Sequence, residues 1–282
     1  MSEGTVCITF DFDALSLWIA RGLATPGPLS RGEFGAFAVP RLLRLLRRYD
    51  IKSTWFVPGH TIETYPALCQ RINDEGHEIA MHGYMHEAVS TLSESGERDV
   101  LSRARDAITN LAGNGPTGNR TPSWDFTDNT VDLLLELGVR YDSSLMGTDY
   151  APTYCRSGDK LNADGPYVFG EPTKLIELPV SWSLDDYPQF EYVRSSNFVM
   201  PGLRTPGEVF GNFLDDVRYM VRDVNDGICV LTFHPQVISR GHRLLGFEAF
   251  LDALTDLNVD YLRMDAVAHN IETGRKYGRE KE

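Results

Sequence analysis

Apolar residues recur along the chain in two alternating patterns, one typical of buried strands and one typical of amphipathic helices. Short β-rich runs predict strands or extended segments at 5–10, 51–57, 77–83, 116–122, 139–145, 175–182, 227–235 and 259–264. Apolar side chains at helical spacing predict helices at 35–49, 61–76, 97–113, 127–138, 205–224, 244–257 and 265–274. The alternation indicates a series of β–α units.

Seven or eight such units fit a (β/α) barrel of the α/β class better than an open doubly wound sheet. No linker, repeat or low-complexity block divides residues 1–282, so we expect a single domain. Residues 146–174 interrupt the alternation with Gly, Pro, Asp and Tyr, and a long irregular segment of this kind predicts a lid-like loop. No strand is followed by a glycine-rich phosphate-binding motif, which disfavours nucleotide-binding functions.

Composition narrows the classes of partner. The chain is 42% hydrophobic and 24% charged, as in ordinary globular proteins, and its formal charge of −13 argues against binding to nucleic acid or anionic membranes. The N-terminus lacks the basic and apolar regions of an export signal, so we expect a cytoplasmic protein without membrane spans. Cys7, Cys69, Cys155 and Cys229 are dispersed without a CxxC pair, which favours reduced thiols in a core.

Polar side chains gather at the carboxyl ends of the predicted strands, where barrel enzymes assemble their chemistry. Such residues are Asp11 and Asp13 after the first strand, His82 and His86 after the third, Arg120 after the fourth and His234 after 227–233. A lone HxxxH or DxD motif is weak support for a metal site, because loops and core histidines produce the same spacing. The convergence of three such signals at strand ends is what favours a site.

The chemistry of these groups suits one divalent metal ion. Two close carboxylates need a counter-charge, since each raises the pKa of the other. Two neutral imidazoles and one carboxylate can hold a divalent ion and leave positions open for water and substrate. A second carboxylate beside such an ion can accept the proton of the attacking water.

The motifs TFDFD (9–13), HGYMH (82–86), RTPSW (120–124) and LTFHP (231–235) resemble, in order, those of the polysaccharide deacetylase family, the metal-dependent deacetylases grouped as carbohydrate esterase family 4. The resemblance implies a distorted (β/α) barrel. It also implies roles for the matching residues: Asp11 as catalytic base, Asp13, His82 and His86 as ligands of a divalent metal, usually zinc, His234 as general acid, Arg120 as the residue that orients Asp11, and Trp124 and Leu231 as pocket residues.

Some positions depart from the family pattern. Gly83 follows His82 where sugar deacetylases usually carry Ser or Thr, and Ser123-Trp124 replaces a small, open motif end with an indole. An insertion at 14–18 brings Trp18 to the expected pocket rim. Asp185 and Asp186 are also expected at the pocket, where one of them would orient His234 by accepting a hydrogen bond from its second ring N–H.

The segments 57–66 and 181–188 further resemble a cytoplasmic, peptidoglycan-deacetylase-like branch that includes enzymes opening cyclic imides or ureides. We therefore expect hydrolysis of a non-peptide carbon–nitrogen bond, with a small cyclic imide, ureide or N-acyl compound as substrate. Two alternatives remain open, namely a de-N-acetylase of N-acetylated sugars in peptidoglycan or chitin, and a catalytically silent binding protein. The branch resemblance also implies a homo-oligomer, with a tetramer as the expected form.

Overall fold

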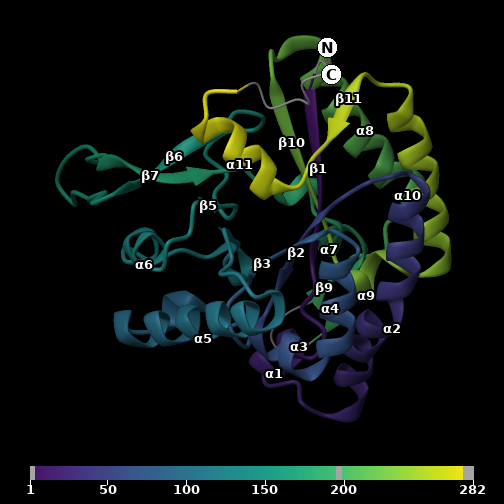
Figure 1. Cartoon of the computed structure of the whole chain (residues 1–282), viewed down its shortest axis with the longest axis horizontal. Helices are drawn as coiled ribbons and strands as arrows, with labels where there is room; N and C mark the ends of the chain where they lie inside the picture. Colours follow the sequence, from purple (N-terminus) through teal and green to yellow (C-terminus); the bar gives the residue numbers. More distant parts are fainter. Residues whose placement is uncertain (1–3, 195–198, 276–282) are drawn as a thin grey trace.

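A single curved sheet organises the part of the chain that the computed structural model describes, residues 4–194 and 199–275 (Figure 1). Seven parallel strands follow one another in the order β10-β1-β2-β3-β4-β5-β7. Their bounds are β1 Gly4–Asp11, β2 Thr54–Val57, β3 Glu78–Met81, β4 Gly118–Asn119, β5 Tyr141–Asp142, β7 Glu171–Glu177 and β10 Gly227–Phe233. β6 (Thr153–Ser157) pairs antiparallel with β7, β11 (Val259–Tyr261) pairs with β1, and β8 (Val193–Arg194) and β9 (Val199–Met200) form a separate small sheet.

The two ends of the parallel sheet meet at one point. After β7, Asp185 forms an isolated parallel bridge with Thr232 of β10. This bridge closes the curve incompletely, and the result is the distorted (β/α) barrel predicted from the sequence. It also brings the segment 185–186 beside the carboxyl end of β10.

Helices surround the sheet, and Figure 1 shows α2, α8 and α10 along one side of it. The helices are α1 Ser16–Ala20, α2 Pro26–Arg48, α3 Gly59–Thr64, α4 Pro66–Asp74, α5 Glu94–Ala112, α6 Thr130–Glu136, α7 Asp186–Phe190, α8 Pro206–Asp223, α9 Pro235–Ile238, α10 Gly241–Thr255 and α11 Met264–Glu272. Short 3₁₀ turns lie at Val89–Thr91, Pro122–Trp124 and Trp182–Leu184. Among these described helices, none has the length and apolar character needed to cross a bilayer.

Two helices differ from the sequence-based expectation because of proline. The helix expected at 61–76 is divided into α3 and α4 at Tyr65, since a residue before proline is disfavoured in the helical region and Tyr65 has ψ 52°. Conversely, α2 begins at Pro26 rather than at residue 35, with Pro26 in the first turn, where proline loses no helical hydrogen bond.

Strand alternation divides the core into an inner and an outer layer. On β10, Ile228 and Val230 belong to the inner cluster, whereas Cys229, Leu231 and Phe233 pack in the outer cluster against the helices. Helix α11 covers the amino-terminal end of the barrel. Its Met264 backbone N–H donates to Oγ1 of Thr54, the first residue of β2, at 2.9 Å. The carboxyl end of the barrel is left for the site.

We had expected the segment 146–174 to be an irregular loop, but part of it forms a β-hairpin. Thr153–Ser157 forms β6, which pairs with β7, and an additional bridge joins Lys160 to Val168. The Gly- and Pro-rich tip of this hairpin obscured the β-forming residues on either side. The hairpin projects from the side of the sheet away from α2, α8 and α10 (Figure 1), and the pocket described below takes no lining residue from it.

Candidate metal centre and catalytic site

The first strand delivers two carboxylates to the carboxyl end of the barrel. Asp11, the last residue of β1, has the same parity as Cys7, whose side chain belongs to the inner core cluster. Asp13 follows β1, and Ala14, with φ 48°, turns the chain into α1. Both carboxylates are buried.

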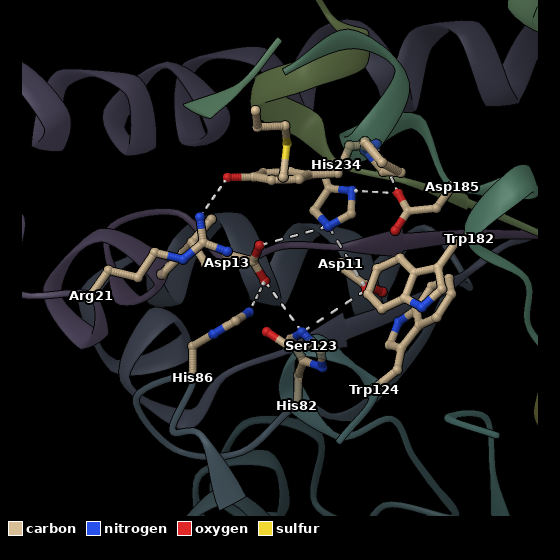
Figure 2. Close-up of a pocket in the computed structure, with 14 residues that line it drawn as sticks. Asp11, Asp13, Arg21, His82, His86, Ser123, Trp124, Trp182, Asp185 and His234 are labelled. Atoms are coloured by element: carbon tan, nitrogen blue, oxygen red, sulfur yellow. Dashed lines mark hydrogen bonds and ion pairs between the residues drawn. The ribbon is translucent and has the colours of Figure 1, made fainter. Parts of the chain in front are cut away.

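Two histidines from the loop after β3 face Asp13. Nε2 of His82 lies 3.4 Å and Nε2 of His86 lies 3.8 Å from Asp13 Oδ1 (Figure 2). The turn between them needs Gly83, which has φ +65° and whose added Cβ would lie 2.9 Å from Pro122 Cγ. This geometry explains why Ser or Thr is absent after His82. His86 itself has φ 60°, an uncommon value for a residue with a side chain.

Protonation at His82 follows from its partners. Nδ1 of His82 lies 2.7 Å from the backbone carbonyl of Arg120, and a carbonyl only accepts, so Nδ1 carries the proton. In the neutral ring, the Nε2 lone pair then faces Asp13, and both Asp13 oxygens lack a hydrogen-bond donor among the described residues. Electron-rich atoms directed at one another in a buried space fit a cation. Candidate donor atoms of Asp13, His82 and His86 lie within 4.8 Å of one another.

The pKa shifts agree with a charged centre. Burial raises the pKa of Asp13, but His86, His82 and His234 lower it more, so it stays well below its ordinary value. Burial lowers the pKa of His86 to about 4, which keeps this imidazole neutral, as a metal ligand must be. For His82, burial lowers the pKa, but Asp11 and Asp13 outweigh burial, so in the metal-free site the net shift is upward. A cation at Nε2 would take the place of that second proton.

Arg120 holds Asp11 from inside the barrel. Its Nη1 donates to Asp11 Oδ1 at 2.7 Å and to the Thr9 hydroxyl, while Nε donates to the Ser143 carbonyl at 3.0 Å. The guanidinium is fully buried and stacks over Phe56 at 4.0 Å. The second Asp11 oxygen, Oδ2, lies 3.9 Å from Nε2 of both His82 and His234. Arg120 therefore fixes one oxygen of Asp11 and leaves the other near the two imidazoles.

His234, directly after β10, is held by the segment that closes the barrel. Oδ1 of Asp186 accepts from both Nδ1 and the backbone N–H of His234, at 2.9 and 3.0 Å, whereas Asp185 Oδ1 lies 3.4 Å from Nδ1. Burial lowers the pKa of His234, but Asp185, Asp186 and Asp13 together raise it to about 10. With Nδ1 directed at Asp186, the ring presents Nε2 to the pocket, 3.8 Å from Asp13 Oδ2.

A pocket of about 190 Å³ opens over these groups. One wall is aromatic, because the Trp124 and Trp182 rings stack with centroids 4.1 Å apart, and Arg21 lies on the opposite side (Figure 2). Ser123 and Trp124 both have positive φ, 55° and 56°, a strained arrangement that sets the direction of this wall. The lining residues are Asp11, Asp13, Leu17, Arg21, His82, His86, Ser123, Trp124, Trp182, Asp185, Tyr187, Pro188, Met200 and His234.

Three residues expected at the pocket do not line it: Trp18 and Leu231 lie in the core, and Asp186 lies behind the His234 ring. In α1, successive side chains point about 100° apart, so Leu17 faces the pocket while Trp18 is buried with Arg31 4.5 Å from its ring. Leu231 points outward from β10 into the core between sheet and helices. Strand parity explains this, since inward positions on β10 are those of Ile228 and Val230.

Several pocket residues were not anticipated. Arg21 follows α1, Tyr187 lies in α7, and Met200 lies in β9, all outside the family motifs. Trp182 belongs to the segment 181–188, which resembles the peptidoglycan-deacetylase-like branch. Its short distance in sequence from Asp185 could have indicated a place in the pocket. Arg21 lies in a connection with no periodic pattern, and only its short distance in sequence from Asp13 hinted at a place near the site.

Comparison with known proteins gives consistent matches. The polysaccharide deacetylase family model matches residues 1–141. The peptidoglycan deacetylase of Helicobacter pylori is 36% identical over 263 residues, which cover 89% of each chain. The crystal structure of a putative polysaccharide deacetylase from Mycobacterium smegmatis is 31% identical, with a TM-score of 0.85 over 100% of this chain and 95% of that one.

A more distant structure, Puue allantoinase, aligns with a TM-score of 0.77 over 96% of this chain and 91% of its own, at 17% identity, and this likeness concerns the fold alone. The first two relatives match nearly the whole chain, and the family model covers the strands that carry Asp11, Asp13, His82, His86 and Arg120. The chain therefore belongs to the polysaccharide deacetylase family and is a hydrolase of amide carbon–nitrogen bonds.

Proposed function

We propose that the protein is a metal-dependent hydrolase of a small amide, such as a cyclic imide, a ureide or an N-acyl compound. The observation that carries this proposal is the placement of Asp13, a buried carboxylate without a hydrogen-bond donor among the described residues, beside two imidazoles, with Asp11 and His234 near them. Asp13, His82 and His86 would hold one divalent ion, with zinc as the expected metal. When bound, such an ion polarises the amide carbonyl and makes water more acidic.

Asp11 acts as the base in this proposal. Its Oδ1 is occupied by Arg120, so Oδ2 is the oxygen that accepts the proton of the attacking water. Arg120 also holds the carboxylate in a single orientation, because it is itself fixed by Ser143 and Thr9. A base held in this way loses little conformational freedom when substrate binds.

His234 acts as the acid. An amide nitrogen leaves readily only as an amine, so a proton must reach it as the carbon–nitrogen bond breaks. Asp186 accepts the Nδ1 proton, which directs the Nε2 proton toward the pocket. Water thus adds across the bond, so that an N-acyl compound gives a carboxylate and an amine, whereas a cyclic imide gives a carboxylate and a carboxamide.

The pocket supports a small substrate. Its volume of about 190 Å³ is below the roughly 300 Å³ at which pockets for drug-sized ligands begin. The stacked tryptophans and Arg21 narrow it from two sides, and a planar amide or imide could lie against the Trp182 ring. The name of the Helicobacter pylori relative favours the alternative, an N-acetylated sugar of peptidoglycan, and the H. pylori protein is similar over most of the chain.

A substrate panel separates these possibilities. We expect zinc-loaded protein to hydrolyse succinimide-like rings, ureides or N-acyl compounds faster than N-acetylated sugar oligomers, as measured by amine or acid release. Asp11→Asn should reduce turnover by about 10²–10⁴-fold, as for loss of a general base. Faster hydrolysis of the oligomers would assign the sugar substrate instead.

The same experiment tests the silent-binding alternative. A binding protein would bind amides without hydrolysing them. Wild type and Asp11→Asn would then both show no turnover. Cytoplasmic location and a homo-oligomer, as a tetramer, remain predictions from the sequence. Cell fractionation and light scattering of the purified chain would check them.

A further inference from the structure

Arg21 brings a cationic side chain to the pocket, across from the tryptophan wall (Figure 2). Its Nη1 donates to the hydroxyl of Tyr187 at 2.9 Å. Tyr187 is buried, and its ring centroid lies 5.0 Å from that of His234. Tyr187 therefore links the position of Arg21 to the side of the pocket where the acid lies.

Arg21 has no ion-pair partner among the residues that the structure describes, although the pocket itself contains three carboxylates. Asp11 is paired with Arg120, and Asp185 lies beside His234. A guanidinium has five N–H donors, and Tyr187 accepts from one nitrogen only. Figure 2 shows the Arg21 group directed toward Asp13. Donors remain for a ligand that enters beside the metal-binding residues.

Other basic residues gather on this side of the pocket. Arg31 lies close enough to Arg21, Arg240 and Arg243 for their charges to lower its pKa, after the larger effect of burial. Arg31 is paired with Glu191, and Arg243 donates to two backbone carbonyls. Of these four arginines, Arg21 lines the pocket. In a chain of formal charge −13, a pocket guanidinium without an ion-pair partner among the described residues favours an anionic group of the ligand at that side.

We propose that Arg21 binds a carboxylate of the substrate, so that the substrate is a small amide or ureide with a carboxylate near the scissile bond, as in an N-acylated or N-carbamoylated amino acid. The planar guanidinium matches a carboxylate through two parallel hydrogen bonds. The carboxylates of the pocket would repel such a substrate without a cation on that side. This inference rests on the amide hydrolysis proposed above and names the substrate class for it.

The test compares matched substrates. N-acetylated and N-carbamoylated amino acids are each paired with the corresponding carboxamide, which lacks the negative charge. We expect wild type to prefer the acid by about 10–100-fold in kcat/KM, the range for a hydrogen bond to a charged group. Arg21→Gln should remove this preference, because KM should rise far more for the acid than for the carboxamide. Arg21→Lys should restore part of it. Arg44→Gln, an exposed arginine of α2 outside the pocket, is the matched control.

Inhibition provides a second readout that does not need turnover of the tested compound. Succinate should inhibit wild type more strongly than acetate, because its second carboxylate reaches Arg21, and Arg21→Gln should abolish the difference. Equal losses for acid and carboxamide in Arg21→Gln would show that Arg21 only supports Tyr187 and would overturn the inference. Hydrolysis of sugar oligomers alone would also overturn it, while amide hydrolysis would stand. Failure of wild type to hydrolyse any amide would instead reject the proposed function.

Discussion

At the residue scale, the position of each proton in the site is set by the partner on the far side of the imidazole ring. The Nδ1–H group of His82 donates a hydrogen bond to a backbone carbonyl, whereas that of His234 donates to the Asp186 carboxylate. A carbonyl leaves the His82 ring neutral and free to bind a metal through Nε2. A carboxylate stabilises the charged His234 ring, which can then donate from Nε2. Two histidines thereby acquire different chemical roles.

Asp186→Asn tests the second of these roles. We expect kcat to fall by about 10–100-fold, as for loss of a supporting carboxylate. Since Asp186 raises the pKa of His234, its loss should move the alkaline limb of the kcat profile to lower pH. Asp185→Asn should shift the same limb with a smaller loss of plateau rate, because Asp186 still holds the ring. Unchanged profiles in both variants would contradict the assignment of His234 as acid.

Residue-level prediction from sequence succeeded where strand ends fix the position of a side chain. Asp11, His82 and Arg120 follow strands whose apolar runs are unmistakable, so the place of each in a barrel could be inferred before the structure. Trp18 was misplaced because sequence gives no rotation for a helix as short as α1. Arg21 was missed because the path of the connection after α1 depends on tertiary contacts, such as the one with Tyr187.

At the element scale, β5 and β7 bury two facing acids. Asp142 and Glu177 are register partners and are both buried. Burial raises the pKa of Asp142 to about 6, and burial with the nearby Asp142 raises the pKa of Glu177 well above its ordinary value. The folded state therefore holds protons that the unfolded chain releases above about pH 4. The protonated pair therefore contributes to the free energy of unfolding at low pH. This contribution is lost as pH rises through the pKa values of the folded state.

Glu177→Gln should reduce this pH dependence. The Gln carbonyl can still accept from the backbone N–H groups of Ser144 and Leu145, and the amide can donate to Asp142. We expect the stability of the variant to rise relative to that of wild type from pH 5 to pH 8, because the glutamine side chain has no proton to lose in this range. Urea unfolding at both pH values measures this. A constant difference between the two proteins would argue against a protonated pair.

The β6–β7 hairpin gives a prediction about a whole element. Residues 161–167 form its exposed tip, and the pocket takes no lining residue from the hairpin. Replacing this tip with a two-residue Asn-Gly turn, which suits a tight hairpin, should leave kcat and KM unchanged. A large fall in kcat would restore the lid role that the sequence suggested. The periodic pattern could not distinguish these cases, because hairpin tips and lids share the same composition.

At the scale of the whole molecule, metal binding and folding stability are linked. Asp13 is buried without a hydrogen-bond donor among the described residues, which is unfavourable unless a cation is present. Zinc at about 100 times its dissociation constant should stabilise the fold by about 2.7 kcal/mol. This corresponds to a rise in Tm of about 5 °C or more. Thermal unfolding with zinc and after chelation measures the shift.

Variants of the ligands supply the control for this measurement. Asp13→Asn and His82→Ala should show little change in Tm on zinc addition and should retain little zinc after dialysis. His269→Ala changes an exposed histidine of α11 and should behave as wild type. An equal zinc response in the Asp13 variant would place the metal elsewhere. The alternation of strands and helices predicted the barrel, but not how its ends meet, since that contact joins residues far apart in sequence.

The closure of the barrel by the Asp185–Thr232 bridge has a consequence for the timing of inactivation. The contact between Asp186 and His234 joins the same two segments, so any local opening there separates the proposed proton donor, His234, from the carboxylate that holds its ring. Sparsely paired regions such as this bridge open at a lower free-energy cost than continuous sheet. On warming, hydrolytic activity should therefore be lost while the strands around β1 are still paired. The pKa of His234 therefore depends on whether the bridge between Asp185 and Thr232 is closed.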